Sequence, residues 1–245
     1  MHTIPINTEE NSLEILGGKG RSLAKMTRSG FRVPDGFIVT ADAYRDFVST
    51  CGIQEEIIEV ATPDLKNGYP NFEECSKKIQ LIIENNQIPD STRNEIIEAY
   101  EGLSGTALRM AVRSSANAED LPEFSFAGQQ ETFLNISTSA AIVESVHKCW
   151  ASLWTPQAIS YRHQNGIDQS SVAMAVVVQE MIPSEVSGIL FTANPSSGER
   201  SQIILNSSFG LGEAVVSGQV TPDTFIVDRQ TLNINEKILG PKAPF

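Results

Sequence analysis

Residues 113–132 of the chain read Arg-Ser-Ser-Ala-Asn-Ala-Glu-Asp-Leu-Pro-Glu-Phe-Ser-Phe-Ala-Gly-Gln-Gln-Glu-Thr. This stretch joins two short apolar, strand-like runs, 108–112 and 132–136. It combines a fixed cation, Arg113, with two hydroxyls and with Gly128, which allows the backbone to approach a ligand closely. A loop of this composition is suited to holding an anion, most often phosphate. It is not one of the standard short phosphate motifs, so a polar surface hairpin with an incidental arginine is the alternative.

A glycine-rich turn precedes the first expected helix. Residues 17–20 read Gly-Gly-Lys-Gly, and a helical pattern follows from Ser22 to about Gly30. Lys19 would therefore lie at a helix N-terminus, where backbone amides and the helix dipole favour an anion. The turn is not a Walker A motif, because no Lys-Ser or Lys-Thr follows the required glycine spacing. A lysine that stands beside glycines without contacting a ligand is the alternative.

Residues 171–181 read Ser-Val-Ala-Met-Ala-Val-Val-Val-Gln-Glu-Met. The unbroken valine-rich run predicts a strand that is buried on both faces. It ends in Gln179 and Glu180, and strand ends of this kind can present backbone groups and apolar neighbours to an adenine ring. Gln179 is therefore a candidate nucleotide contact. The alternative is a strand that simply leaves the core.

The rest of the chain shows ordinary helix and strand patterns, which we interpret as scaffold. A stripe at helical spacing over 141–154 predicts a core helix, and neither His147 nor His163 has a carboxylate or cysteine at a telling spacing. Asp90, directly after Pro89, is the expected cap of one helix. Further helices are predicted at 41–49, 72–84 and 90–100, and strands within 31–40 and at 188–192, 202–206 and 224–228.

The composition is that of an ordinary globular protein, with 40% hydrophobic and 20% charged residues in 245. The formal net charge of −12 argues against nucleic acid or an anionic membrane surface as the main partner. Three separated cysteines (Cys51, Cys75 and Cys149) predict buried thiols and neither a disulfide framework nor a zinc site. No signal-peptide pattern or spanning apolar run is present, so we expect a cytoplasmic location.

The central stretch also resembles a known family. Its pattern Arg-Ser-Ser-x-x-Ala-Glu-Asp-Leu-Pro, followed by Phe-Ala-Gly-Gln-Gln-Glu-Thr, is similar to the nucleotide-binding domain of phosphoenolpyruvate synthase (pyruvate, water dikinase) and of its relative rifampin phosphotransferase. The resemblance extends over the whole chain, from the turn at 17–20 to Gly-Leu-Gly-Glu at 210–213. Pyruvate, phosphate dikinase is a more distant relative, whose equivalent loop reads differently.

The resemblance implies ATP and Mg²⁺ as ligands and assigns roles to five residues. Lys19 stands in the place of the family's Gly-Gly-Lys lysine, which touches the ATP phosphates, and Arg113 would neutralise phosphate charge beside it. Gly128 and Thr132 would bring backbone and hydroxyl donors over the phosphates from a mobile lid. Gln179 would lie near the adenine or the ribose. No catalytic residue is assigned within the chain, and metal ligands are expected beyond residue 245.

The fold that the resemblance implies is α+β, a two-lobed nucleotide-binding domain of the ATP-grasp kind. Residues 1–181 would form the first lobe, with a phosphate lid loop at 113–132. Residues 182–245 would form a second lobe that is truncated here. We therefore expect the chain to be part of a longer enzyme.

By the same resemblance, the whole enzyme would pass the β-phosphoryl group of ATP to a histidine on a swivelling domain, releasing AMP and phosphate. A substrate domain would then receive it, with pyruvate as the favoured acceptor and phosphoenolpyruvate as the product. An antibiotic phosphotransferase acting on rifampin is one alternative. A non-catalytic nucleotide-binding module is another, and a protein-interaction domain without a ligand is the third.

Overall fold

The computed structural model describes residues 1–63, 70–103, 109–116 and 131–241. The chain divides into two compact units, Met1–Met181 and Ile182–Phe245. Each unit contains one antiparallel sheet, so the fold mixes helices and strands around two separate sheets. Among the described residues, no helix combines the length and the apolar character that crossing a membrane requires.

The first unit contains a five-stranded sheet of order β1-β2-β5-β3-β4, in which every neighbouring pair is antiparallel. Its strands are β1 (Thr3–Pro5), β2 (Gly36–Val39), β3 (Met110–Ala116), β4 (Thr132–Ile136) and β5 (Met174–Glu180). Its helices are α1 (Leu13–Arg28), α2 (Ala41–Thr50), α3 (Gln54–Ala61), α4 (Phe72–Glu84), α5 (Asp90–Glu101), α6 (Ser139–Ser152), α7 (Pro156–Gln164) and the 3₁₀ turn η2 (Gln169–Ser171).

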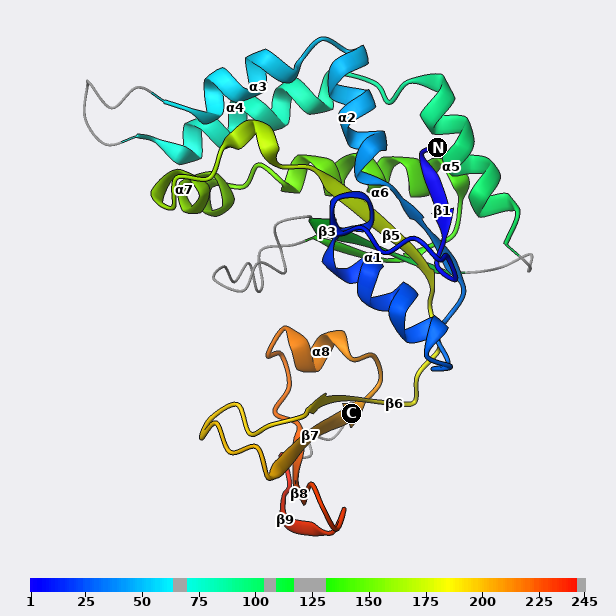
Figure 1. The fold of residues 1–245 in the computed structure, drawn as a ribbon, viewed down its shortest axis with the longest axis vertical. Coiled ribbons are helices and arrows are strands. Elements are labelled where there is room, and N and C mark those ends of the chain that lie inside the picture. The colour runs from blue at the N-terminus through cyan, green and yellow to red at the C-terminus, as the bar shows by residue number, and fades with distance from the viewer. Residues whose placement is uncertain (64–69, 104–108, 117–130, 242–245) are drawn as a thin grey trace. The chain divides into compact units, whose positions relative to one another are not determined.

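Helices cover both faces of this sheet. Figure 1 shows α1 on one side of it and the layer containing α2, α5 and α6 on the other. β5 is the central strand, and its residues Met174 to Gln179 are all buried. The prediction of a valine-rich strand buried on both faces is confirmed. The physical cause is this double helical cover, because an antiparallel sheet with one open face would alternate buried and exposed residues.

The helical layer packs around aromatic side chains. Trp150 on α6 stacks on Phe47 of α2 at a centroid distance of 5.2 Å and meets the edge of Tyr44 at 5.9 Å. The Trp154 indole N–H donates to the Tyr44 hydroxyl at 2.9 Å. The stripe predicted over 141–154 is therefore core, as expected, and its helix ends at Ser152.

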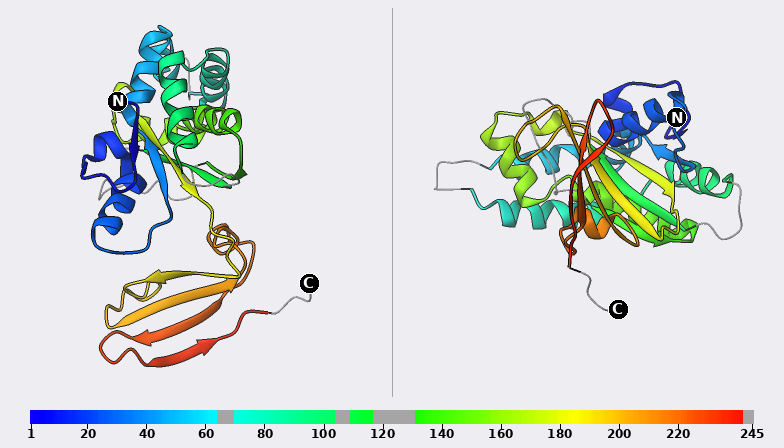
Figure 2. Two further views of the ribbon diagram at one scale, coloured as in Figure 1. Left: turned by 90° about the vertical axis from the view of Figure 1, so that its right-hand side faces the viewer. Right: turned by 90° about the horizontal axis from the view of Figure 1, so that it is seen from below.

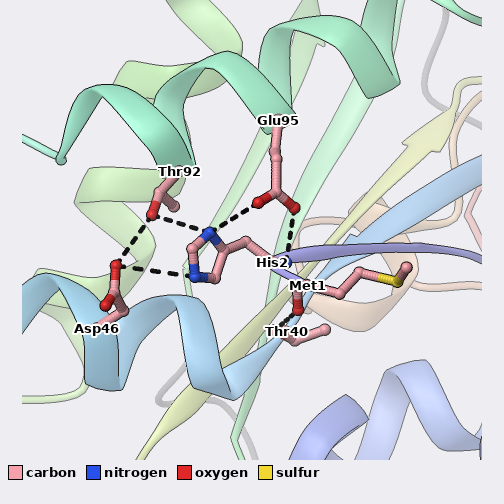
Figure 3. A network of polar contacts seen from close by, with 6 residues as sticks. All are labelled: Met1, His2, Thr40, Asp46, Thr92 and Glu95. Carbon is pink, nitrogen blue, oxygen red and sulfur yellow. Dashed lines mark hydrogen bonds and ion pairs between the residues drawn. The ribbon is translucent and has the colours of Figure 1, made fainter.

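The N-terminus is tied to the helical layer by a polar network around His2 (Figure 3). The His2 backbone amide donates to Glu95 Oε2 at 2.7 Å, and Nδ1 of its ring lies 3.1 Å from Oε1 of the same carboxylate. On the other side of the ring, Nε2 lies 3.7 Å from Asp46 Oδ2. Thr92 contacts both His2 and Asp46. The network therefore joins the residue before β1 to α2 and α5.

The second unit is a four-stranded antiparallel sheet of order β6-β7-β8-β9 with one short helix (Figure 2). Successive strands along the chain are neighbours in the sheet. Ile204 is the one buried apolar residue among those described in this unit. Its elements are β6 (Val186–Phe191), β7 (Gln202–Phe209), α8 (Glu213–Val216), β8 (Asp223–Asp228) and β9 (Ile234–Ile238).

Some local predictions were wrong. Arg113–Ala116, expected at the start of a loop, continue strand β3, because each of these residues pairs with β5. The first helix begins at Leu13, before the glycines, and Asp90 is the first residue of α5 with Pro89 in the cap position. Helix α3 and strand β9 were not predicted. Both are short, and β9 is exposed along its length, so neither has a strong periodic pattern.

Candidate nucleotide-binding site

The glycine-rich turn is a break inside helix α1. Gly17 has φ 65° and ψ 176°, a conformation outside the helical range that divides α1 into two segments. A side chain at Gly17 would also place its Cβ 2.0 Å from the Ser115 carbonyl oxygen. Both the backbone angle and the close contact require glycine here. Lys19 therefore lies at the start of the second helical segment, as predicted. The prediction did not include the first helical segment, which precedes the glycines.

The Ser115 hydroxyl bridges the two sides of this break. It donates to the Leu16 carbonyl oxygen at 3.0 Å and accepts from the Gly20 amide at 3.1 Å. Ser115 and Gly20 are 95 residues apart in the sequence. These hydrogen bonds thus join the two stretches that the sequence analysis identified as candidate anion sites, the Gly-Gly-Lys-Gly turn and the Arg-Ser-Ser run.

Strand register places three of the predicted residues on one face of the first sheet. Arg113 pairs directly with Thr132 on β4, and two positions away along β3 Ala111 pairs with Gln179 on β5. Residues paired across antiparallel strands share a face, and positions two apart along a strand share it as well. Arg113, Thr132 and Gln179 therefore lie on the same face as Ser115, the face that α1 covers.

Spacing along β3 gives the extent of this surface. Ser115, which contacts the Lys19 turn, and Ala111, which pairs with Gln179, are four residues apart on the strand. At about 3.3 Å per residue, the two ends lie roughly 13 Å apart. Arg113 lies midway between them. Along β3, the contact with the Lys19 turn, Arg113 and the residue that pairs with Gln179 therefore follow one another at intervals of two residues.

Lys19 and Glu131 both influence the buried thiol of Cys149 on α6. Burial raises the pKa of Cys149 well above its ordinary range, the Glu131 carboxylate adds to that rise, and the Lys19 ammonium opposes it. Lys19 and Glu131 therefore each lie within electrostatic range of Cys149.

Gln179 is itself held by the protein. It is 7% exposed, and its Nε2 donates to the Pro34 carbonyl oxygen at 3.1 Å. The two following backbone amides donate to the carbonyl oxygens of Asp35 and Arg109, both at 2.8 Å. The expected presentation of backbone groups at this strand end therefore does not extend to the amides of Glu180 and Met181. The side chain of Gln179 has a fixed orientation.

The two serine hydroxyls of the central stretch bond to the backbone. Ser114 Oγ donates to the Glu131 carbonyl oxygen at 3.1 Å, and Ser115 Oγ donates to Leu16. The expectation that these hydroxyls donate to an anion is corrected, because both serines are fully buried and each proton has a backbone acceptor. The bridging role of Ser115 was missed, since no local sequence signal links residues so far apart.

The remaining predicted positions have simpler outcomes. Gly128 and most of the lid loop lie outside the described residues. In the parts of the chain that the structure describes, no group of three His, Cys, Asp or Glu side chains could hold a metal ion. The cysteines that were expected to be buried thiols differ, because Cys149 is buried whereas Cys51 and Cys75 are partly exposed.

Strongly perturbed ionisable groups also occur in the helical layer, away from this surface. Burial lowers the pKa of Arg162 to about 10 and raises that of Tyr44 to about 12. Arg162 donates to Gln169 Oε1 at 2.6 Å and to the Leu153 carbonyl oxygen at 2.9 Å, and lies over the Trp154 ring. These contacts explain Arg162 as a packed core residue, so its perturbation does not mark a second site.

Comparisons with known proteins point to one family for this chain. Residues 13–244 match the family "Pyruvate phosphate dikinase, AMP/ATP-binding domain". The chain is 46% identical over 234 residues to a probable phosphoenolpyruvate synthase of Methanocaldococcus jannaschii, covering 94% of this chain and 20% of that protein. It is 45% identical over 236 residues to the phosphoenolpyruvate synthase of Aeropyrum pernix (94% and 29%), and 39% identical over 269 residues to that of Pyrococcus furiosus (95% and 33%).

The chain thus spans about a fifth to a third of the length of the curated relatives it matches. The family match covers nearly all residues of this chain, including the broken helix α1, the strand β3 that carries Arg113 and the central strand β5. The chain belongs to the family of pyruvate phosphate dikinase AMP/ATP-binding domains.

Proposed function

We propose that this chain is the ATP-binding domain of a phosphoenolpyruvate synthase-type dikinase and that ATP binds across the α1-covered face of the first sheet. The observation that supports this most strongly is the register that aligns Arg113, Thr132 and Gln179 beside the Lys19 turn. The family match, which names AMP and ATP as ligands, supports it independently.

Each proposed contact has a distinct physical role. Lys19 and Arg113 neutralise phosphate charge, each charge-assisted hydrogen bond contributing roughly 1.5–3 kcal/mol. The Thr132 hydroxyl adds a donor from β4, and Gly128, which lies outside the described residues, would add a backbone donor. Gln179 contacts the adenine or ribose. Mg²⁺ enters with the ATP phosphates, and we assign it no ligand among the described residues.

The reaction proposed for the whole enzyme is transfer of the β-phosphoryl group of ATP to a histidine on another domain, and from there to pyruvate. The three histidines of this chain support an acceptor elsewhere. His2 is held between two carboxylates, His147 packs edge-on against Phe47, and His163 packs against Phe72. This chain therefore contributes alignment and charge stabilisation, which is most of what phosphoryl transfer asks of a protein. We also propose that the fold is of the two-lobed ATP-grasp kind.

Calorimetric titration of the chain with ATP–Mg²⁺ tests the site. Lys19→Ala and Arg113→Ala should each weaken binding about ten- to a hundredfold, the size of one lost charge-assisted contact. Lys148→Ala and Arg93→Ala are matched controls, because both cations lie on exposed helix faces and pair with carboxylates of their own helices. Controls that bind like the unaltered chain are expected. Unchanged affinity in both site variants would rule out the phosphate assignment.

A further inference from the structure

We propose that Ser115 is a positioning residue for the ATP site, holding the Gly17–Gly20 turn, and with it Lys19, against the strand that carries Arg113. This role presupposes the ATP site proposed above. Ser115 would not touch the nucleotide itself.

The two groups that Ser115 joins identify what its hydroxyl replaces. In a regular α-helix the Gly20 amide would donate directly to the Leu16 carbonyl oxygen, four residues earlier. Gly17, which lies between them, is not in the helical conformation. The Ser115 hydroxyl is inserted between the two groups, accepting from the Gly20 amide and donating to the Leu16 carbonyl oxygen. Insertion of a side chain into the helical ladder is a known cause of a sharp kink.

The surroundings of Ser115 make this arrangement specific. The residue is fully buried, so an unpaired hydroxyl, amide or carbonyl group there would be unfavourable. Gly17 packs against Ser115 so closely that an added Cβ would lie 2.4 Å from its hydroxyl oxygen. The turn therefore fits against β3 with little room for another position.

The Ser115 hydrogen bonds should influence the distance between the two proposed phosphate-binding cations, Lys19 and Arg113. Lys19 precedes Gly20, which Ser115 holds, and Arg113 lies two residues from Ser115 on the same face of β3. One buried hydroxyl thus connects the helical segment of the lysine to the strand of the arginine. A shift of about 1 Å in such a contact can change the function of a site substantially, so this hydroxyl should influence ATP affinity without contacting ATP.

Calorimetry with ATP–Mg²⁺ separates this role from ordinary packing. Ser115→Ala should weaken ATP binding about three- to tenfold, the scale of one net hydrogen bond. Ser145→Ala is the matched control, because Ser145 is also buried and its hydroxyl donates to the helical carbonyl of Ala141 at 2.7 Å on the other side of the sheet. Ser145→Ala should change ATP affinity less than twofold. Equal affinities for Ser115→Ala and the unaltered chain would overturn the proposal.

A double-mutant cycle with Lys19 provides a result that a purely structural role would not give. If Ser115 acts by placing Lys19, then Ser115→Ala should have little further effect on affinity in a Lys19→Ala background. Fully additive losses would contradict the positioning role. Ser115→Cys, which keeps a side chain of the same shape with a somewhat larger sulfur and only a weak donor and acceptor, should also lower affinity, and it covers the case in which the alanine variant fails to fold. Wild-type affinity in the cysteine variant would equally overturn the proposal.

The outcomes distinguish this inference from the proposed function. If Lys19→Ala and Arg113→Ala lose ATP affinity and Ser115→Ala does not, the proposed ATP site is supported and only the positioning role of Ser115 is refuted. Unchanged affinity in all three variants would remove both.

Discussion

The two sheets of this protein are both antiparallel, yet they differ in what covers them. The central strand of the first sheet, β5, is buried from Met174 to Gln179, whereas every residue of β9 in the second sheet is exposed. The buried core of the described chain lies in the first unit, with Ile204 the single exception. Backbone pairing is similar in the two sheets, so the difference in apolar burial should set their difference in stability.

The comparison also bears on where the site is. The proposed ATP contacts among the described residues lie on β3, β4, β5 and α1, all elements of the well-packed unit. Side chains held on such elements keep their positions better than side chains on loosely covered ones. The first sheet is therefore packed well enough to hold phosphate-binding side chains in place. The second sheet has a similar antiparallel pattern but lacks that buried packing.

Amide hydrogen exchange should show the largest contrast. The amides of Val176–Val178 on β5 should open only with the whole unit and exchange roughly ten-thousandfold more slowly than the amides of β9 that point toward β8. Mass spectrometry of peptides from both strands measures this directly. Similar protection in the two strands would break the comparison, since apolar burial would then not determine stability here.

Matched aromatic truncations should give the next largest effect. Trp150 is fully buried, so Trp150→Ala should lower the free energy of unfolding of the first unit by about 3–5 kcal/mol. Phe209 on β7 is 62% exposed, and Phe209→Ala should change the stability of the second unit by no more than about 0.5 kcal/mol. Urea unfolding followed by Trp154 fluorescence reports on the first unit, and hydrogen exchange reports on the second.

Trp150→Phe sharpens this test. Within the described structure the Trp150 indole N–H has no hydrogen-bond partner, so its loss removes no bond. The phenylalanine variant should therefore be distinctly more stable than the alanine variant. Equal destabilisation by both would indicate that aromatic packing on Phe47 is not what Trp150 contributes.

Protonation of His147 should have a smaller effect, on the stability of the first unit. Burial lowers the pKa of His147 below its ordinary value of 6.5, against the opposing influence of the Ile83 backbone and Glu84. The unfolded chain therefore takes up a proton more readily, so stability is fully present above about pH 6.5 and falls as the pH drops below it. His147→Gln should flatten the decline in unfolding free energy between pH 7 and pH 5. Parallel declines in the variant and the unaltered chain would exclude His147 as a cause.

Local structure was predictable wherever the pattern was long or strongly biased. Helix α4 at Phe72–Glu84 and strand β4 at Thr132–Ile136 have the predicted bounds, and the valine-rich segment is the buried central strand. In each case side-chain periodicity or β-branched content within one segment carries the information. The short helix α3 and the exposed strand β9 lack such a signal, which is why they were missed.

The candidate site also has features that the sequence predicted and features that it could not predict. The sequence nominated Lys19 by its glycines and Arg113 by the unusual run that follows it, and it could not say that Arg113–Ala116 are strand, because that follows from pairing with β5. Nor could it assign the serine hydroxyls. Their partners, Leu16, Gly20 and Glu131, lie 17 to 99 residues away along the chain.

The sequence by itself determined the residue types of an anion site, the family resemblance and the main buried strand, because these depend on short-range composition and spacing. Only the tertiary structure decided that Gly17 breaks a helix around the Ser115 hydroxyl and that Arg113, Thr132 and Gln179 share one face. The physical reason is that register and burial are fixed by contacts between segments distant in the chain, where a shift of one residue would turn every side chain of a strand to the other face.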